Sequence, residues 1–331
     1  LTQVARAAKR LPAGVRFALT GTPIENRLSE LWSIFDFLMP GLLGTRESFA
    51  KRFESPVEHA EGDSAARLQA LVSPFVLRRV KEDVVADLPE KIEDTVMAQL
   101  TGEQRKLYLA NQDRIAQQVQ HREASEFKKD KLKVLAELTK LRQICCDPRL
   151  HYEDYKAGSA KLDTCMELVH GALDGGHRIL LFSQFTGMLD IIGKRLAKED
   201  IAFFKLTGAS SKESRAKMVA QFQAGEVPVF LISLKAGGVG LNLTAADVVI
   251  HYDPWWNVAA QDQATDRAHR IGQQHTVTVY KLIAKDTIEE RIMQMQESKR
   301  DLVNSVLGGD GISSALFTRE DVLALLGGDG R

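Results

Sequence analysis

The sequence predicts an α/β fold in which a parallel sheet is covered by helices on both faces, with helical protrusions added to it. From residue 160 onward, short apolar runs alternate with helical segments of ten or more residues, which is typical of a parallel sheet. The run 227–234 is short and mostly apolar, with three β-branched residues, as expected for a strand buried on both faces. Ligands of such sheets bind at the carboxyl ends of the strands.

The elements expected in this region follow one another in regular order. The expected strands cover residues 178–185, 201–206, 227–234, 247–253 and 276–283, the last of them nearer the edge of the sheet. The expected helices cover residues 161–173, 187–198, 211–222, 258–271 and 286–307.

The first half of the chain is expected to be mostly helical. Residues 15–19 have the composition of a short strand, and Leu28–Leu38 carries apolar residues at helical spacing. Residues 101–144 contain no proline and predict a helical protrusion that Pro148 stops. The polar residues 151–159 are expected to form a linker.

Composition bounds the class of protein and its partners. The 331 residues suffice for roughly two domains. Lys and Arg number 44 and so do Asp and Glu, so overall charge predicts neither a nucleic-acid nor a membrane partner, and DNA binding would need local patches. Apolar runs fall well short of the ~20 residues of a membrane helix, so no membrane is expected.

Cysteine usage favours a reducing compartment. The three cysteines are Cys145, Cys146 and Cys165; the first two are adjacent, which is not a metal-ligand spacing. An odd count argues against a disulfide framework. We therefore expect buried, reduced thiols, no metal site, and an intracellular protein.

A glycine-rich run, AGGVGLNL, directly follows the expected strand 227–234. Glycine lets the backbone approach a ligand closely, here at Gly238 and Gly240. The run is no Walker A motif, because Leu241 and Asn242 stand where Lys and Ser or Thr are needed. By itself such a run more often marks an ordinary turn between a strand and a helix.

Two arginines follow at a spacing of three. On the expected helix 258–271, Arg267 and Arg270 share one face. Guanidinium groups stay charged and fork onto phosphate oxygens. Beside a glycine loop they indicate a phosphoryl-transfer site at which arginine stabilises transition-state charge. The alternative is a solvated helix face.

Taken together, AGGVGLNL, DPWWN and DRAHRIGQ resemble motifs V and VI of the Swi/Snf family of ATP-dependent DNA translocases, in helicase superfamily two. The sheet would then be the second RecA-like lobe. The resemblance implies that Arg267 and Arg270 are arginine fingers and that Gln263, Gly238 and Gly240 contact ATP. Val258 departs from the family, which usually has Pro after WWN.

Three further stretches extend the resemblance. LTGTPIENRLSELWSIFDFLMPGLLG is similar to motif III, which implies that Thr20, Gly21 and Thr22 couple ATP hydrolysis to DNA movement. FSQFTGMLDII resembles motif IV, and KLTGASSKESR the segment after it, with Thr207 where the family has Asp. The DNA-binding residues implied by the resemblance are Thr207, Gly208, Ser233, Lys235, Arg78 and Arg79. For the arginines a solvated face is the alternative.

The resemblance also implies a domain organisation. The expected parts are the end of a first RecA-like lobe (1–28), helical protrusions and an inter-lobe segment (29–150), a linker (151–159), the second lobe (160–285), and a C-terminal helix and tail (286–331). The sequence contains neither G-x-x-x-x-G-K-[ST] nor D-E-x-H. We therefore expect an amino-terminal ATPase lobe outside this sequence, ATP and Mg²⁺ in the intact enzyme, and no ATPase activity from this chain alone.

The expected function is that of the carboxyl-terminal half of a double-stranded-DNA-dependent ATPase that translocates on DNA to remodel protein–DNA complexes. Its expected partners are duplex DNA, the amino-terminal lobe and a DNA-bound protein. Two alternatives stay open: a non-catalytic DNA- or partner-binding module, and a strand-separating helicase of the same superfamily. The expected location is the nucleoid and cytoplasm of a bacterium, or the nucleus of a eukaryote.

Overall fold

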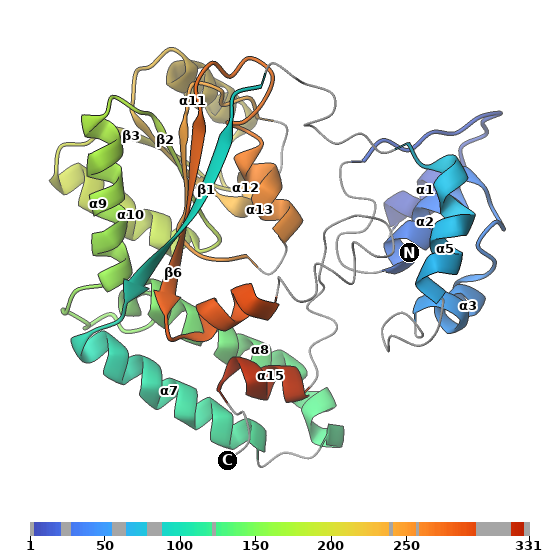
Figure 1. Ribbon diagram of the computed structural model, residues 1–331, viewed down its shortest axis with the longest axis horizontal. Coiled ribbons are helices and arrows are strands. Elements are labelled where there is room, and N and C mark those ends of the chain that lie inside the picture. The colour runs from blue at the N-terminus through green and yellow to red at the C-terminus, as the bar shows by residue number, and fades with distance from the viewer. Residues whose placement is uncertain are drawn as a thin grey trace. The chain divides into compact units, whose positions relative to one another are not determined.

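The computed structural model describes residues 3–20, 28–54, 64–77, 88–120, 124–237, 241–255, 258–295 and 319–327 (Figure 1). The chain forms two compact units. The first holds the helices from the N-terminus to residue 75, and the second holds the sheet and the helices packed on it.

The first unit is a small helical cluster. Its elements are α1 (Gln3–Lys9), α2 (Leu28–Leu38), α3 (Arg46–Phe49), the π-helix η1 (Ala50–Glu54), α5 (Ser64–Val72) and the 3-10 helix η2 (Ser73–Phe75). The helix expected at 28–38 is confirmed, and its apolar stripe builds the core: Leu31 and Phe35 are buried together with Phe49 and Leu68.

The strand expected at residues 15–19 is wrong. These residues form no strand, and the side chains of Val15, Phe17 and Leu19 are 72%, 84% and 100% exposed. A strand exists only where a neighbouring strand accepts and donates its backbone hydrogen bonds. The described residues of the first unit contain no other strand to do so.

The second unit confirms the predicted α/β class. Its strands are β1 (Lys91–Gln99), β2 (Ile179–Ser183), β3 (Phe203–Leu206), β4 (Val229–Ser233), β5 (Val248–His251) and β6 (Val277–Lys285). All the pairings are parallel, in the order β1-β6-β5-β2-β4-β3. The central strand β2, ILLFS, is buried at every position, because helices cover both faces.

Alternate residues of the strands enter two separate core layers. Leu181 packs in the layer of α9 (Ala160–Asp174) and α10 (Thr186–Lys198). Its neighbour Phe182 packs in the layer of α11 (Lys212–Gln223) and α13 (Val258–Thr265). Figure 1 shows α9 and α10 on one side of the strands and α13 on the other. Helices therefore cover both faces, as predicted.

Further helices lie at one end of the sheet. They are α7 (Gly102–Gln120), α8 (Ala124–Cys146), the 3-10 helix η3 (Pro148–Leu150) and α15 (Arg319–Leu325). α8 buries Leu138 and Leu141 but leaves Leu132 82% exposed, so its leucines contribute to the core only in part. Gln112 of α7 donates from Nε2 to the carbonyl oxygen of Leu326, 2.7 Å away, and so holds the end of α15.

Two expected boundaries differ from the structure. Residues 91–99 fall in the segment expected to be helical and inter-lobe, yet they form β1, which pairs with β6 along its whole length. The expected linker 151–159 lies inside the second unit, where Ser159 is buried and donates from Oγ to the carbonyl oxygen of Cys146 (2.8 Å). The sequence did not predict β1, because β1 is an exposed edge strand without a continuous apolar run.

The expected helix 286–307 is helical from residue 288 to residue 295, and its remainder lies outside the described residues. No helix in the described part of the chain is long and apolar enough to span a membrane.

Candidate functional site

The residues Asp266 to Gln273, named the arginine segment, follow the end of α13. Arg267 and Arg270 lie in turns after Thr265, not on the helix. The expectation of one shared helical face is therefore wrong. Beyond Thr265, carbonyl groups that a continued helix would use accept from other donors: Arg267 O accepts from Leu243 N (3.0 Å), and Ala268 O accepts from Gln273 Nε2 (3.2 Å).

The two guanidinium groups occupy different environments. Arg267 is half-buried, and its Nε is buried with no hydrogen-bond partner among the described residues, whereas Arg270 is exposed. Burial and, secondly, the charge of Arg270 lower the pKa of Arg267, while Asp266 acts in the opposite direction. Arginine still keeps its proton. A desolvated donor beside a second positive charge fits an anion such as a phosphate oxygen.

A buried histidine holds the end of α13 on the sheet. His251, the last residue of β5, is 1% exposed, stacks on Phe182, and shares a hydrogen bond of 2.8 Å between its Nε2 and Thr265 Oγ1. Burial, followed by the charge of Lys281, lowers the pKa of His251 to about 3, so the ring is neutral at pH 7. This contact fixes Thr265, the residue directly before the arginine segment, to the carboxyl end of β5.

The remaining predicted ATP-binding residues are only partly described. Gln263 lies on α13 and is half-buried. Gly238 and Gly240 lie outside the described residues, which resume at Leu241. β4 is followed directly by α12 (Leu234–Gly237), one turn of helix that contains the backbone of Lys235.

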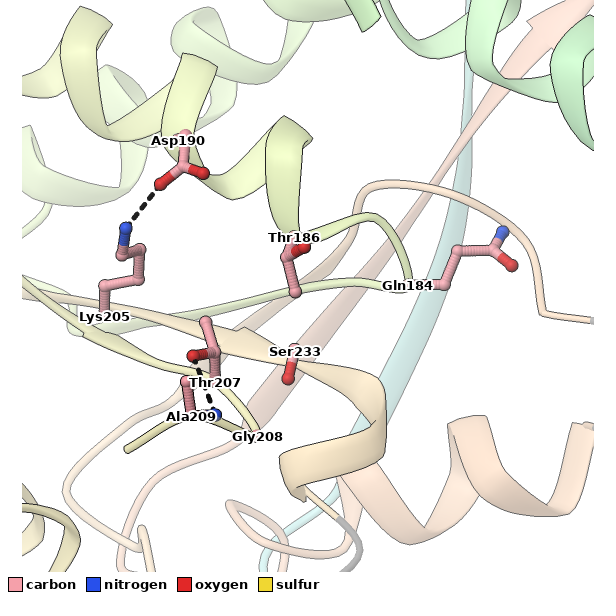
Figure 2. A pocket seen from close by; sticks show the side chains of 8 residues that line it. All are labelled: Gln184, Thr186, Asp190, Lys205, Thr207, Gly208, Ala209 and Ser233. Carbon is pink, nitrogen blue, oxygen red and sulfur yellow. Dashed lines mark hydrogen bonds and ion pairs between the residues drawn. The ribbon is translucent and has the colours of Figure 1, made fainter. Parts of the chain in front are cut away.

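A pocket of about 450 Å³ opens at the carboxyl ends of β2, β3 and β4. Figure 2 shows the side chains that line it: Gln184, Thr186, Asp190, Lys205, Thr207, Gly208, Ala209 and Ser233. The pocket brings together three of the residues predicted to bind DNA, namely Thr207, Gly208 and Ser233. They meet because parallel strands end at one edge of the sheet.

The pocket combines hydroxyl groups, backbone and one lysine. The loop after β3 is held by its own hydrogen bonds, since Thr207 N donates to Ser210 Oγ (3.2 Å). At Gly208 there is open space where a side chain would stand. Lys205 forms an ion pair with Asp190, which partly neutralises it. Such donors suit a phosphate group and do not read base sequence.

Prediction from sequence missed five of the eight residues that line this pocket. Gln184 and Thr186 stand in the stretch FSQFTGMLDII, to which no site residue was assigned. Lys205 stands in KLTGASS, where only Thr207 and Gly208 were assigned. The available signal was that these residues stand at the carboxyl ends of expected parallel strands, which meet at one edge of the sheet. Buried Asp253 was missed as well; it accepts from Ser183 Oγ (2.5 Å) and Gln184 N (3.2 Å) and so shapes the loop that carries Gln184.

The other predicted site residues do not belong to the described part of the second unit. Thr20 belongs to the first unit and is exposed. Gly21, Thr22, Arg78 and Arg79 lie outside the described residues. Within the described ranges, no group of three or more His, Cys, Asp or Glu residues has the arrangement of a metal site.

The sequence matches two family profiles: residues 1–150 match the SNF2-related domain, and residues 160–272 match the helicase conserved C-terminal domain. YwqA of Bacillus subtilis, a putative ATP-dependent helicase/translocase, is 41% identical over 330 residues, covering 96% of this chain and 35% of that protein. The chain spans between about a fifth and about a third of the length of the curated relatives it matches.

Two similar solved structures come from Sulfolobus solfataricus, each 38% identical. One is a SWI2/SNF2 ATPase core domain, with a TM-score of 0.61 over 98% of this chain and 67% of that chain. The other is a SWI2/SNF2 ATPase core in complex with dsDNA, with a TM-score of 0.58 over 93% of this chain and 65% of that chain.

Proposed function

Because the chain belongs to the Swi/Snf family of helicase superfamily two, we propose that it is the carboxyl-terminal half of a double-stranded-DNA-dependent ATPase that translocates on DNA and remodels protein–DNA complexes. The observation that carries this proposal is the arginine segment. It presents two guanidinium groups after the end of α13, and one of them has a buried Nε with no hydrogen-bond partner in the described part of the chain.

In this proposal Arg267 and Arg270 act as arginine fingers. They stabilise the charge that spreads over the transferred phosphoryl oxygens, so they accelerate the chemical step more than they tighten nucleotide binding. Gln263, Gly238 and Gly240 contact the nucleotide. The phosphates and Mg²⁺ are held by an amino-terminal lobe with Walker A and B motifs, because this sequence contains neither.

The pocket at the ends of β2, β3 and β4 is proposed to hold a DNA phosphate. Thr207, Gly208 and Ser233 supply hydroxyl and backbone donors, and Lys205 supplies positive charge. Lys235, Arg78 and Arg79 extend the contact along the backbone. The dsDNA in the complex of the similar Sulfolobus solfataricus core supports duplex DNA as the ligand.

The two activities are linked by lobe movement. Closure on ATP brings the arginine segment to the nucleotide, and opening after hydrolysis advances the DNA-binding surface along the duplex, as in other hinge motions of two-lobed enzymes. Thr20, Gly21 and Thr22 are proposed to transmit this movement. A DNA-bound protein ahead of the enzyme would be displaced or moved.

ATP hydrolysis tests this function when this chain alone is compared with the intact enzyme, each with and without duplex DNA. We expect DNA-stimulated turnover from the intact enzyme and none above background from the chain alone. Turnover by the isolated chain would refute the assignment of the phosphate and Mg²⁺ contacts to another lobe. DNA binding without turnover by the intact enzyme would favour the binding module, and strand separation on a forked duplex would favour the helicase.

A further inference from the structure

His269 stands between the two arginines and contacts a distant part of the chain. Its Nε2 lies 2.7 Å from the carbonyl oxygen of Pro89, which is 180 residues away in sequence. A carbonyl oxygen only accepts hydrogen bonds, so Nε2 carries the proton and donates it. Neutral and protonated imidazole both meet this requirement.

Pro89 lies where the inter-lobe segment enters the sheet. It is two residues before β1, and its neighbour Glu90 accepts a hydrogen bond from Val277 N at the start of β6 (3.0 Å). The chain at 89–90 is therefore held at two successive carbonyl groups. One holds it to the sheet, and the other, through His269, holds it to the arginine segment.

The arginine segment has a separate attachment to its own lobe. Gln273 is buried, and its amide makes four hydrogen bonds: Nε2 donates to Ala246 O (2.8 Å) and Ala268 O (3.2 Å), and Oε1 accepts from the backbone N–H groups of Gln274 and His275. These contacts fix the segment to the loops before β5 and β6. None of them involves the inter-lobe chain.

We propose that His269 is a positioning residue that couples the inter-lobe chain to Arg267 and Arg270. Gln273 holds the segment in its lobe, and His269 makes the position of the two guanidinium groups depend on the chain that arrives at Pro89. A change in the placement of the inter-lobe chain on closure is thereby transmitted to the arginines. The inference rests on the proposed function, because it assigns the arginines to the reaction.

The first test is made in the intact enzyme, with His269→Ala, His269→Gln and the control His275→Ala. A catalytic group displaced by about 1 Å loses on the order of 10²-fold in rate, so His269→Ala should lower DNA-stimulated kcat by roughly 10- to 100-fold. Nucleotide Kd and Tm should stay near wild type. His269→Gln should recover much of the loss, because its amide N–H can donate to Pro89. His275 is exposed, and its replacement should change none of these values.

The second test uses amide hydrogen exchange in this chain and needs no ATPase activity. Val277 N–H reports on the chain at Glu90, and Leu243 N–H reports on the backbone of Arg267. His269→Ala should accelerate exchange at both amides by about tenfold or more, as expected when a local restraint is removed. His275→Ala should leave both rates unchanged.

The outcomes separate the two claims. If alanine at Arg267 or Arg270 lowers kcat but His269→Ala changes neither kcat nor exchange, the coupling is refuted and the proposed function stands. If His269→Ala lowers kcat and Tm together and glutamine gives no recovery, His269 is merely structural and the coupling is again refuted. If the arginine variants keep normal turnover, the proposed function is refuted and the coupling with it.

Discussion

Lys161 Nζ lies 2.5 Å from Glu289 Oε2, and both side chains are completely buried. Burial by itself lowers the pKa of Lys161, but the charge and hydrogen bond of Glu289, together with nearby Cys146 and Asp253, outweigh burial, so the pKa is raised. Glu289 Oε2 also accepts from the backbone N–H of Ala284 (2.8 Å). The pair ties α9 to the helical residues that follow β6.

Removing one partner of this pair should be costly. Lys161→Met leaves the carboxylate of Glu289 buried and unpaired, and such losses cost about 3–5 kcal/mol of unfolding free energy. The double variant Lys161→Met, Glu289→Gln should lose less than the sum of the single variants, because no isolated charge remains. Urea unfolding of the four proteins measures this. Additive losses would mean that the two groups do not interact.

His251 should make stability fall in acid. Its pKa is about 3 in the folded protein and about 6.5 when unfolded, so between these values the unfolded chain binds one more proton. The contribution of neutral His251 to the free energy of unfolding is complete above pH 6.5 and decreases by about 1.4 kcal/mol per pH unit below it. Between pH 7 and pH 5, wild type should lose about 2 kcal/mol more than His251→Gln.

Denaturant unfolding at a series of pH values measures how the free energy of unfolding changes with pH. The variant His275→Gln, at an exposed position, is the control and should show the same pH dependence as wild type. Parallel curves for wild type and His251→Gln would show that His251 titrates normally and is not held neutral.

The fold was predictable where a local pattern reports burial. β2 is apolar at every position because helices cover both its faces, so its sequence alone marks it as a central strand. β1 is different: seven of the nine residues Lys91–Gln99 are exposed, and what defines the strand is its pairing with β6, far along the chain. The strand predicted at residues 15–19 is absent for the opposite reason. Its alternating apolar residues fit a strand, but a local pattern does not supply the neighbouring strand with which it would pair.

The site was predictable in residue type more than in geometry. The motif resemblance selected Arg267 and Arg270, and family membership is confirmed by the comparisons. Their placement after α13 depends on Leu243 and Gln273, which take carbonyl groups that a longer helix would have used. Helical periodicity carries no information about such distant donors. The same holds for Lys205 and Asp190, which join the pocket through the arrangement of the strands.

Freeing Lys205 should strengthen DNA binding. Asp190 pairs with Lys205 at the pocket, so Asp190→Asn leaves a lysine available to a phosphate. Each phosphate neutralised adds about −0.9 to the slope of log K against log salt. We therefore expect Asp190→Asn to bind duplex DNA more tightly, with a slope steeper by up to about one unit, and Lys205→Gln to bind more weakly.

Fluorescence anisotropy with labelled random duplexes over a salt series measures both quantities. Asp174→Asn makes the same charge change at an exposed position at the end of α9, away from the pocket, and is the matched control. Equal gains from the two aspartate variants would indicate a general charge effect and remove Lys205 from the DNA contact.

The rate of ATP hydrolysis in the intact enzyme tests the central claim, that the arginine segment supplies the charge that stabilises the transition state. With saturating duplex DNA, Arg267→Ala and Arg270→Ala should each lower kcat by on the order of 10³-fold or more, with ATP binding much less affected. Lysine at either position should rescue poorly, because an ammonium group cannot fork onto two oxygens. Near-normal turnover in both alanine variants would contradict the account and leave Arg267 and Arg270 as surface arginines.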